Sequence, residues 1–430
     1  MLSAFSASQS PARLAKQTIA PVATARLLLF ELSVGGHYPS YIQHLITYWQ
    51  EQNLPGILDI LVTPAFLIQH QDVVQSVKAR SSRSQVLFHT ITLAEAKQLA
   101  DRNSALGRLR RNFQEWSLLQ KYTQQLGSRH AFIPYLDTRF LPIAFGQKLP
   151  CTFSGIYFRP TWHYNKLQGL KSNWKTRLSK FILHRILNQT QLTQLFCLDP
   201  FAVDSLRRQK QGRKTAPIAD PVQTFPKDDL RTQALKRQLG IDRDRQVFLL
   251  FGAINHRKGI HQLLDSLELL TPKEMAKTCI LIVGTLADAP DAAQIRHRIN
   301  ALSHYCPVQV IHVEDYVPES DIPHYFQLSD VVLAIYQRHV GMSGILVRAA
   351  LAQKPVLSSD YGLMGAVTTR HQLGKTIDST KPSEIAHGIG ELLVTSLKTV
   401  GDRKLMQKFG EQNSPERFAQ TVFRSIWQVS

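Results

Sequence analysis

The stretch from residue 329 to residue 362 constrains the fold of this chain more than any other. It opens with an apolar run at 331–335, which is typical of a strand buried on both faces of a parallel sheet. A loop with Gly341 and Gly344 follows, then a segment with helical periodicity, and 355–357 begins another strand. Strand, glycine loop, helix and strand in this order build an anion-binding site at a helix N-terminus in α/β folds.

The remaining sequence continues this alternation and predicts two domains. At 430 residues, the chain is long enough for two domains with cores of their own. Such alternation of strands and helices favours an α/β fold with a parallel, doubly wound sheet. A polar stretch with three prolines and no periodicity, residues 210–227, predicts the linker. The strands expected in the second half are 247–251, 279–283, 308–312, 331–335 and 356–358.

These features divide the chain into four parts. Residues 1–24, rich in Ala and Ser, predict a flexible N-terminal tail, with a transit peptide as the alternative. Residues 25–215 and 223–410 predict the two domains, and 411–430 a terminal helix. The four cysteines are widely separated, which predicts neither a metal site nor a disulfide framework and indicates a reducing compartment such as the cytoplasm. No apolar run approaches the roughly 18 residues needed to cross a bilayer.

Positive charge is concentrated in the first half of the chain. Residues 1–222 contain 27 Lys and Arg against 11 Asp and Glu, whereas the rest contains 24 against 21. This asymmetry indicates that the first half faces something anionic: lipid headgroups, nucleic acid or an anionic substrate. No nucleic-acid-binding motif accompanies the basic residues, so we expect no nucleic-acid partner.

The basic clusters at 170–187 and 106–113 are the candidates for that contact. The first contains no acidic residue, and its apolar side chains share one helical face. It fits a helix that lies on an anionic membrane surface, which would make the protein peripheral at the inner, cytoplasmic face of a membrane. A helix packed into the core with a solvated basic face explains the same pattern, and the sequence leaves both alternatives open.

A second chemical signal lies at 247–259. There a buried strand is followed by Gly252, a short polar loop and then Lys258 at the start of an amphipathic helix. Because α/β sheets bind ligands at the C-terminal ends of their strands, Lys258 would meet a phosphate as a point charge beside free backbone N–H groups. A solvated lysine near a helix start is the alternative.

Together these motifs resemble those of the nucleotide-sugar glycosyltransferases of GT-B fold, in the large retaining group called family four. The resemblance rests on FGAINHRKGIHQLLDSL, LIVG at 281–284, YVPESDIPHYFQLSDVVL and GMSGILVRAALAQKPVLSSDYG. It is good across about residues 228–395 and loose over the first 220. It implies two Rossmann-like domains facing a cleft, with the last helix packing back on the N-terminal domain. It also implies a reaction that needs neither a metal ion nor another cofactor.

The resemblance implies roles for individual residues. Gly35 and Gly36 match the family's glycine loop beside the acceptor, and we add Arg159 to that side. The residues expected at the donor are Gly252, Lys258, Gly284, Gly341, Met342, Ser343, Gly344 and Arg348. The residues considered for catalysis are His37, His163 and Asp137. An ordinary surface histidine and a turn-forming aspartate are the alternatives for the last two, and capping alone is the alternative for Ser343.

Three positions depart from the family pattern. Ala253 stands where the family commonly has arginine, while Val340 and Arg348 stand where it has glutamates that contact the donor sugar and the ribose. Valine makes no such hydrogen bond, and arginine only donates. Three accounts are open: a different donor whose extra anionic group contacts Arg348, weak donor binding through Lys258 and the loop alone, or lost catalysis.

The sequence therefore predicts an enzyme that transfers a sugar from a nucleotide diphosphate sugar to a hydroxyl acceptor. A glycolipid or a polysaccharide is the kind of acceptor expected, and the resemblance implies retention of the anomeric configuration. The alternative is a catalytically inactive nucleotide-sugar-binding or scaffold protein on the same fold.

Overall fold

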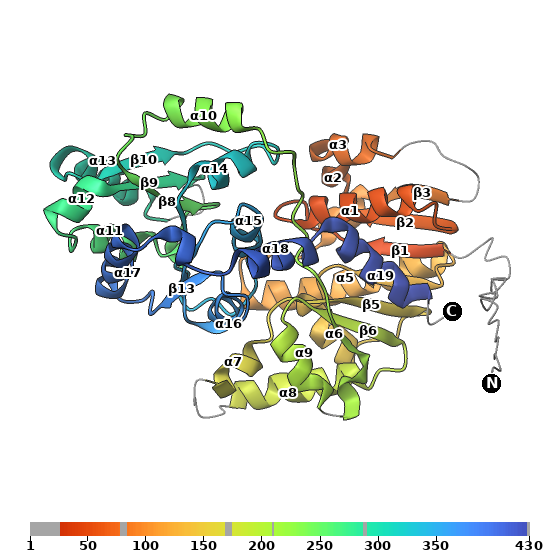
Figure 1. The fold of residues 1–430 in the computed structure, drawn as a ribbon. Helices are drawn as coiled ribbons and strands as arrows, with labels where there is room; N and C mark the ends of the chain where they lie inside the picture. The colour runs from red at the N-terminus through yellow and green to blue at the C-terminus, as the bar shows by residue number, and fades with distance from the viewer. Residues whose placement is uncertain (1–25, 78–83, 168–173, 209, 287–289, 428–430) are drawn as a thin grey trace, which may run out of the picture.

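The computed structural model describes residues 26–77, 84–167, 174–208, 210–286 and 290–427. The predicted tail at 1–24 and the start of the basic segment, 170–173, lie outside these ranges. Within them the chain forms two α/β domains, each a parallel sheet with helices on both faces (Figure 1). The predicted fold class is confirmed. None of the described helices is both long enough and apolar enough to cross a membrane.

The N-terminal domain is built on seven parallel strands in the order β3-β2-β1-β4-β5-β6-β7. Leu27, Leu28 and Leu29 on the central strand β1 are almost completely buried, as expected for a strand with helices on both faces. The strands are β1 (Arg26–Phe30), β2 (Gly56–Val62), β3 (Ser84–Thr90), β4 (His130–Ile133), β5 (Thr152–Tyr157), β6 (Leu192–Cys197) and β7 (Thr215–Pro217).

Two groups of helices cover this sheet. The first group, on one face, is α1 (Tyr38–Glu51), α2 (Pro64–Gln69), α3 (Gln71–Gln75) and, from the end of the chain, α19 (Pro415–Trp427). The second group, on the other face, is α5 (Ala105–Gln125), α6 (Phe140–Phe145), α7 (Thr161–Leu167), α8 (Trp174–Leu187) and α9 (Pro200–Arg207). Shorter elements are α4 (Leu93–Gln98) and the 3-10 turns η1 (Asp137–Arg139) and η2 (Lys210–Lys214). Each face therefore has a core of its own.

The C-terminal domain has six parallel strands in the order β10-β9-β8-β11-β12-β13. These are β8 (Gln246–Phe251), β9 (Thr278–Val283), β10 (Gln309–Val313), β11 (Val331–Ala334), β12 (Val356–Ser359) and β13 (Gly374–Ile377). The sequence did not predict β13, because its residues Gly-Lys-Thr-Ile lack an apolar run and only pairing with β12 defines the strand.

Helices again cover both faces. One face carries α10 (Asp229–Gln238), α14 (Ile322–Leu328), α15 (Gly344–Leu351), α16 (Gly362–Arg370) and α18 (Arg403–Gln412). The other carries α11 (Ile260–Leu267), α12 (Pro272–Lys277), α13 (Ala292–Tyr305) and α17 (Pro382–Val394). The 3-10 turns are η3 (His256–Lys258) and η4 (Leu397–Thr399).

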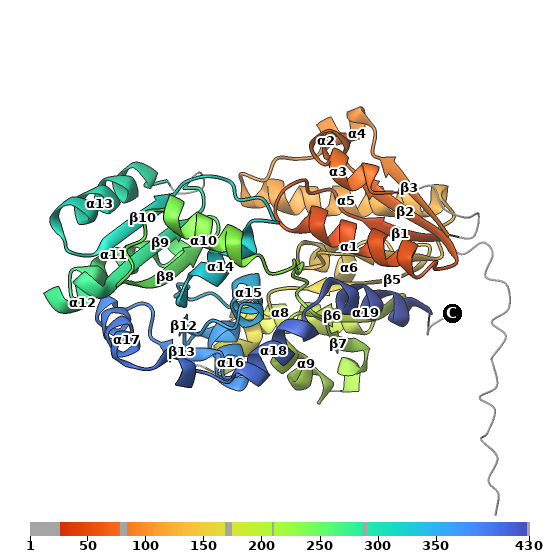
Figure 2. The same ribbon diagram turned by 45° about the horizontal axis from the view of Figure 1, so that its top comes forward.

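The chain crosses between the domains twice. The first crossing, residues 218–228, is shorter than the predicted linker because β7 pairs with β6 and extends the first sheet to Pro217. The second joins α18 to α19, and α19 then lies on the N-terminal domain (Figures 1 and 2). There the ring of Phe423 packs 5.3 Å from that of Trp49 in α1. The last helix thus completes the core of the first domain.

Asn413 fastens the two crossings to each other. Its side-chain oxygen accepts a hydrogen bond from the backbone N–H of Asp220 at 2.9 Å. Its backbone oxygen accepts another from Val222 at 3.0 Å. Because Asn413 is itself buried, these bonds are shielded from water and hold the crossings side by side.

Candidate functional site

Two glycine turns close the C-terminal ends of the adjacent strands β8 and β9. Gly252 has a φ of 105° and Gly284 a φ of 135°, a backbone region that favours glycine. A Cβ on Gly284 would lie 2.1 Å from the carbonyl oxygen of Gly252, so a side chain there would force the turns apart. The two turns themselves therefore carry no side chain at the place where α/β folds bind ligands.

Lys258 lies just beyond this edge, and its side chain is buried within the protein, with only 5% of the residue exposed. Its ammonium donates to the carbonyl oxygen of Phe251 at 2.7 Å and to the hydroxyl of Tyr336 at 2.5 Å. The Tyr336 hydroxyl lies 2.7 Å from Oγ of Ser343, which caps α15 by accepting from the backbone N–H of Ile345. A continuous chain of hydrogen bonds thus joins the lysine to the glycine loop.

The Lys258–Tyr336 pair is electrostatically coupled. Burial lowers the pKa of Lys258, and the tyrosine opposes that shift. Burial alone raises the pKa of Tyr336, but the Lys258 ammonium, the hydrogen bond with Ser343 and the charge of Arg257 together outweigh burial, and the net shift is downward. Arg257 adds a second cation 5.2 Å from the centre of the same ring. The glycine loop therefore stands in a region of positive potential.

His339 and Arg159 extend this positive region across the domain boundary. Burial, together with the charges of Arg257 and Arg159, lowers the pKa of His339 to about 4. Arg159 follows β5 in the first domain. A Cβ on Gly341 would lie 3.9 Å from the carbonyl oxygen of Phe158, so the domains meet here. The structure brings predicted residues of both halves together at this point.

His37 stands at the start of α1 in an aromatic setting. The ring centroids of Tyr38, Tyr41 and Phe158 lie 4.6, 4.8 and 5.2 Å from its own. Burial of the imidazole, with the charge of Arg159, lowers its pKa to about 4. The ring is therefore uncharged at neutral pH and exchanges hydrogen bonds as a neutral group.

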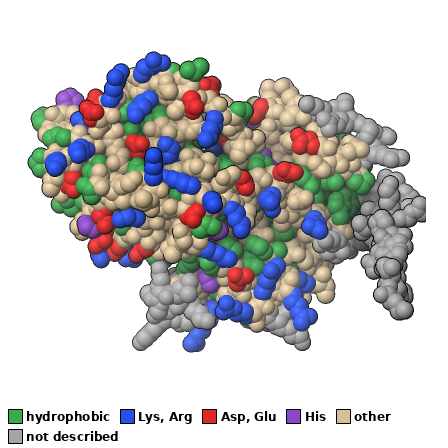
Figure 3. Space-filling model, viewed as in Figure 1, with side chains coloured by type: hydrophobic (Ala, Val, Ile, Leu, Met, Phe, Trp, Pro, Cys, Tyr) green, Lys and Arg blue, Asp and Glu red, His purple; other side chains and the backbone are tan. Residues whose placement is uncertain are grey.

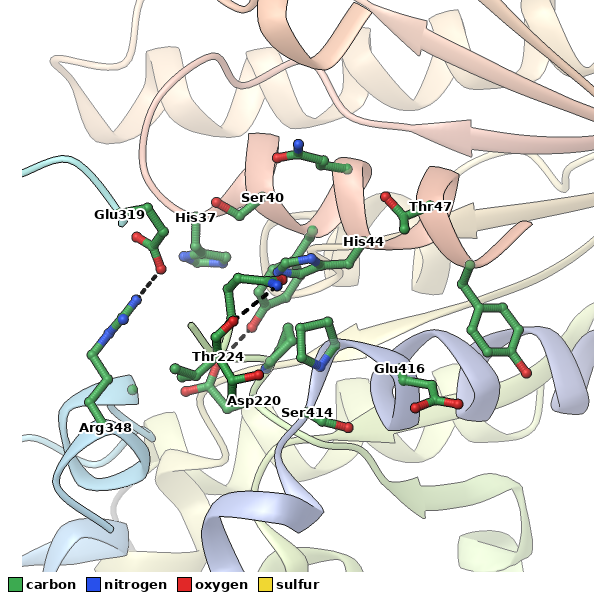
Figure 4. Close-up of a pocket in the computed structure, with 18 of the residues that line it drawn as sticks. His37, Ser40, His44, Thr47, Asp220, Thr224, Glu319, Arg348, Ser414 and Glu416 are labelled. Carbon is green, nitrogen blue, oxygen red and sulfur yellow. Dashed lines mark hydrogen bonds and ion pairs between the residues drawn. The ribbon is translucent and has the colours of Figure 1, made fainter. Parts of the chain in front are cut away.

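A cavity of about 1160 Å³ lies between the domains alongside α1 (Figure 4). It is lined by α1 and the turn before it, the first crossing, the loop before α14, the glycine loop with α15, and the start of α19. The predicted residues that line it are Gly36, His37, Met342, Gly344 and Arg348. Its volume exceeds the roughly 300–1,000 Å³ of most small-molecule sites, so it has room for groups bound to both domains at once.

Arg348, which the sequence comparison predicts to stand at a family glutamate position, forms an ion pair with Glu319 from the loop before α14. Figure 4 shows the two side chains pointing toward each other at one end of the cavity. The Arg348 side chain is 16% exposed and that of Glu319 is 46% exposed, so the carboxylate is the more open member. A carboxylate is thus present beside α15 although positions 340 and 348 hold none.

A second carboxylate, Asp220, reaches the cavity from the first crossing. It accepts a hydrogen bond from the Tyr41 hydroxyl at 2.9 Å, which ties the crossing to α1. Burial raises the pKa of Asp220 to about 6, although that hydrogen bond and the charge of Arg348 act in the opposite direction.

Two predicted catalytic residues do not line this cavity. The Asp137 carboxylate accepts hydrogen bonds from the backbone N–H groups of Phe158 and Arg159 at 2.8 and 2.9 Å. Burial raises the pKa of this carboxyl to about 6. These two hydrogen bonds join the loop after β4 to the loop after β5, so Asp137 has a turn-forming role. His163 lies in α7, with its ring 5.1 Å from that of Tyr164. Neither residue is placed to act on a ligand in the cavity.

The other predicted residues lie behind or beside the cavity wall. Gly35, next to His37, has open space where a Cβ would stand. Gly252, Lys258, Gly284, Ser343, Gly341 and Arg159 are absent from the lining of the cavity. No group of three or more His, Cys, Asp or Glu within the described ranges is arranged to hold a metal ion. The predicted donor residues therefore fall into a buried hydrogen-bonded set and an open set.

Sequence reasoning missed three residues of the site: Tyr336, Glu319 and Asp220. Tyr336 directly follows the apolar strand run, and Glu319 lies within the segment YVPESDIPHYFQLSDVVL, so the motifs themselves contain both residues. Asp220 lies in the polar stretch assigned to the linker, and nothing in its neighbourhood marks it.

Residues 231–413 match the family model described as glycosyl transferases group 1. Among curated proteins, YtcC of Bacillus subtilis (strain 168), which carries a glycosyltransferase name, is 24% identical over 189 residues. That alignment covers 44% of this chain and 44% of YtcC, so the chain spans less than half the length of this relative.

Likeness to solved structures extends over almost the whole chain. A glycosyltransferase from Rickettsia africae ESF-5 has a TM-score of 0.63 at 12% identity, covering 95% of this chain and 99% of its own. Sucrose-phosphate synthase from Thermosynechococcus elongatus has a TM-score of 0.64 at 14% identity, covering 94% and 100%. Anabaena HepE, in complex with UDP and glucose, has a TM-score of 0.61 at 14% identity, covering 94% and 100%. We conclude that the chain has the GT-B fold and that its residues 231–413 are similar to the glycosyl transferases group 1 family.

Proposed function

We propose that this protein transfers a sugar from a nucleotide diphosphate sugar to a hydroxyl acceptor, with retention of configuration and without a metal ion. The observation that carries the proposal is the cavity where the glycine loop of the second domain faces the His37 turn of the first. The family match supports it, since it covers the half expected to hold the donor. HepE, a solved structure of the same fold, is in complex with UDP and glucose, which makes UDP the first nucleotide to test.

The donor diphosphate is proposed to bind at the glycine loop and the start of α15. Lys258 has donors only, so its bond to Tyr336 leaves the tyrosine proton for Ser343. The Ser343 hydroxyl is then free to donate to a phosphate oxygen. Together with the helix N-terminus, this chain would stabilise the negative charge that develops on the leaving diphosphate. Lys258 would thus act on the diphosphate indirectly, through the hydroxyl groups of Tyr336 and Ser343.

The nucleoside is proposed to bind at the other end of the loop, with Glu319 accepting hydrogen bonds from its ribose hydroxyls. Three facts support this: the carboxylate is half exposed, it lines the cavity, and Arg348 holds it beside α15. An ionised carboxylate only accepts hydrogen bonds, which is what a pair of hydroxyl groups requires. Arg348 is then a positioning residue that compensates for the missing family glutamate.

The acceptor is proposed to lie over the turn formed by Gly35, Gly36 and His37. Neutral His37 can accept from an acceptor or sugar hydroxyl while its other nitrogen donates. Arg159 would face the same space from the loop after β5. A glycolipid or polysaccharide acceptor is proposed, and a cytoplasmic location at the inner face of a membrane is proposed with it.

Isothermal titration with UDP, GDP and ADP, paired with a donor-hydrolysis assay, tests the proposal. We expect one nucleotide to bind and the corresponding sugar donor to be hydrolysed slowly. Ser343→Ala should weaken nucleotide binding by about 1–3 kcal/mol, the range for a hydrogen bond to a charged group. Ser117→Ala, at an exposed position of α5, is the control and should bind the nucleotide as the wild type does. Binding without turnover of any donor would favour the inactive scaffold, and no binding at all would refute both functions.

A further inference from the structure

The helices α5, α6 and α8 form a layer on one face of the N-terminal sheet. Their inward side chains share a single core. Arg185 in α8 donates to the carbonyl oxygen of Ala144 in α6 at 3.2 Å. Trp116 in α5 donates to that of Gln147, just after α6, at 2.8 Å. The three helices therefore lie in contact, and their outward faces form one continuous surface.

This surface exposes an unusual number of large apolar side chains. Leu106 on α5 is 76% exposed and Trp174 on α8 is 68% exposed. The full set of exposed large apolar residues on the layer is Leu106, Leu109, Phe113, Phe145, Trp174, Leu178 and Phe181. On α8 they recur at intervals of four and three, so they form one stripe, while Ile182 and Ile186 face the core. Soluble surfaces rarely gather aromatic and aliphatic side chains in this way.

The same surface is basic, and Asp101, just before α5, is an exposed carboxylate at its border. Residues 102–198 contain 15 Lys and Arg but only two acidic residues, Glu115 and Asp137. The Glu115 side chain is buried in ion pairs with arginines, and the Asp137 carboxylate is held by two backbone N–H groups. In Figure 3, Lys and Arg side chains gather along the lower edge of the molecule, where Figure 1 places α8 and α9. The exposed cations described on α5 and α8 are Arg108, Arg110, Lys121, Arg177, Lys180 and Arg185, and of these Lys121 is paired with Glu95.

The topology places the apolar part of the layer near the cleft. Because all strands are parallel, α5 and α8 both start at the edge of the sheet where the strands end and run back to the other edge. Their exposed apolar residues lie in their first two or three turns. That edge also carries Gly35, His37 and Arg159, the proposed acceptor side. A flat surface that covered the starts of both helices would therefore adjoin the mouth of the cleft.

We propose that the outward face of α5, α6 and α8 docks on an anionic lipid bilayer. Its aromatic and aliphatic side chains would enter the headgroup boundary while the surrounding cations contact anionic headgroups. A nucleic acid has no apolar phase into which Leu106 or Phe181 could insert. A surface that binds an acidic protein would be expected to have a less uniformly basic rim than this one. This docking is a property of the protein surface and is independent of sugar transfer, although it would bring a lipid-borne acceptor to the cleft.

Vesicle sedimentation tests the proposal with the full-length protein. Vesicles of phosphatidylcholine alone are compared with vesicles that contain about one third phosphatidylserine, at low and at high salt. We expect binding to the anionic vesicles only, and its loss at high salt because surface charges are screened. Two double variants remove one contribution each: Leu178→Ser with Phe181→Ser, and Arg177→Glu with Lys180→Glu.

The expected loss is large enough to measure. Each removed cation lowers partitioning by roughly fivefold, and charge reversal by more, so both double variants should bind at least tenfold more weakly. Leu230→Ser with Lys277→Glu, at exposed positions of the second domain, is the matched control and should bind as the wild type does. UDP titration and thermal melting of each variant separate docking from donor binding and from folding.

Three outcomes would overturn the proposal: a wild-type protein that stays in the supernatant with anionic vesicles, patch variants that sediment as well as the wild type, or RNA binding without vesicle binding.

Discussion

Reversing the charge of Arg348 tests directly how the cavity holds its ligand. Arg348→Glu introduces the residue type that the sequence resemblance predicts for this position, and from the sequence alone it should improve donor binding. The structure predicts the opposite, because the new carboxylate would face Glu319 and lie near Asp220. Three carboxylates at one end of the cavity would repel one another and an incoming nucleotide diphosphate.

The magnitude follows from the geometry of the pair. Two unit charges about 4 Å apart interact by about 2 kcal/mol at an effective dielectric constant near 40. Replacing attraction by repulsion would then change the free energy of unfolding by about 4 kcal/mol. Because Glu319 is nearly half exposed, solvent screening reduces the expected loss to about 2 kcal/mol. The exchange variant, Arg348→Glu with Glu319→Arg, restores the attraction and should recover most of the loss.

Urea unfolding of the wild type, both single variants and the exchange variant gives a double-mutant cycle with an expected coupling of about 4 kcal/mol, because each single reversal costs about 2 kcal/mol and the exchange variant costs little. Isothermal titration with UDP and its 2′,3′-dideoxy analogue then tests the ribose contact. The wild type should prefer UDP, and Glu319→Gln should lose that preference. Lys375→Glu, which faces Glu391 outside the cavity, is the control: it should lose stability without changing nucleotide affinity. Strictly additive effects, or tighter UDP binding by Arg348→Glu, would refute the reasoning.

Three further results are expected. Burial raises the pKa of Asp220 to about 6, above its unfolded value of about 3.9, so the free energy of unfolding should fall as the pH rises from 4 to 6. The Asp220→Asn variant, measured by urea unfolding, should match the stability of the wild type at pH 4 and exceed it by about 1–2 kcal/mol at pH 7.5. Asp137→Asn should instead lower stability at pH 7.5 by about 1–3 kcal/mol, because an amide presents only one acceptor to two N–H groups; equal stability would contradict this. Tyr336→Phe removes the bridge between Lys258 and Ser343 and should weaken UDP binding about tenfold while leaving affinity unchanged in a Ser343→Ala background, with calorimetry as the measurement.

The sequence predicted the fold because its strong signals are local. The apolar runs at 247–251, 279–283 and 331–335 could only be buried strands, and each lies within one or two residues of β8, β9 and β11. β13 was missed because a short polar edge strand is defined by its partner, and β7 was missed because three prolines concealed it in the expected linker. Edge strands carry little periodicity of their own, so tertiary pairing decides them.

The site was less predictable because it depends on contacts between distant residues. The sequence identifies Lys258 as a cation near a strand end, but it does not show that the ammonium turns inward to Tyr336, 78 residues away. The resemblance predicts a glutamate where Arg348 stands, but the sequence does not show that Glu319 lies against that arginine. Motif positions are therefore informative about location, whereas the direction of a side chain follows from the packing around it.

The double crossing held together by Asn413 has a mechanical consequence. Two neighbouring tethers allow the domains to rotate about the line that joins them, yet they resist sliding or twisting of one domain past the other. Opening and closing of the cleft would then follow a single angular path, with Tyr41 and Asp220 beside the axis. Removing the last helix would cut one tether and uncover the first domain's core at once. The protein would then lose the constraint on its domain motion together with part of its stability.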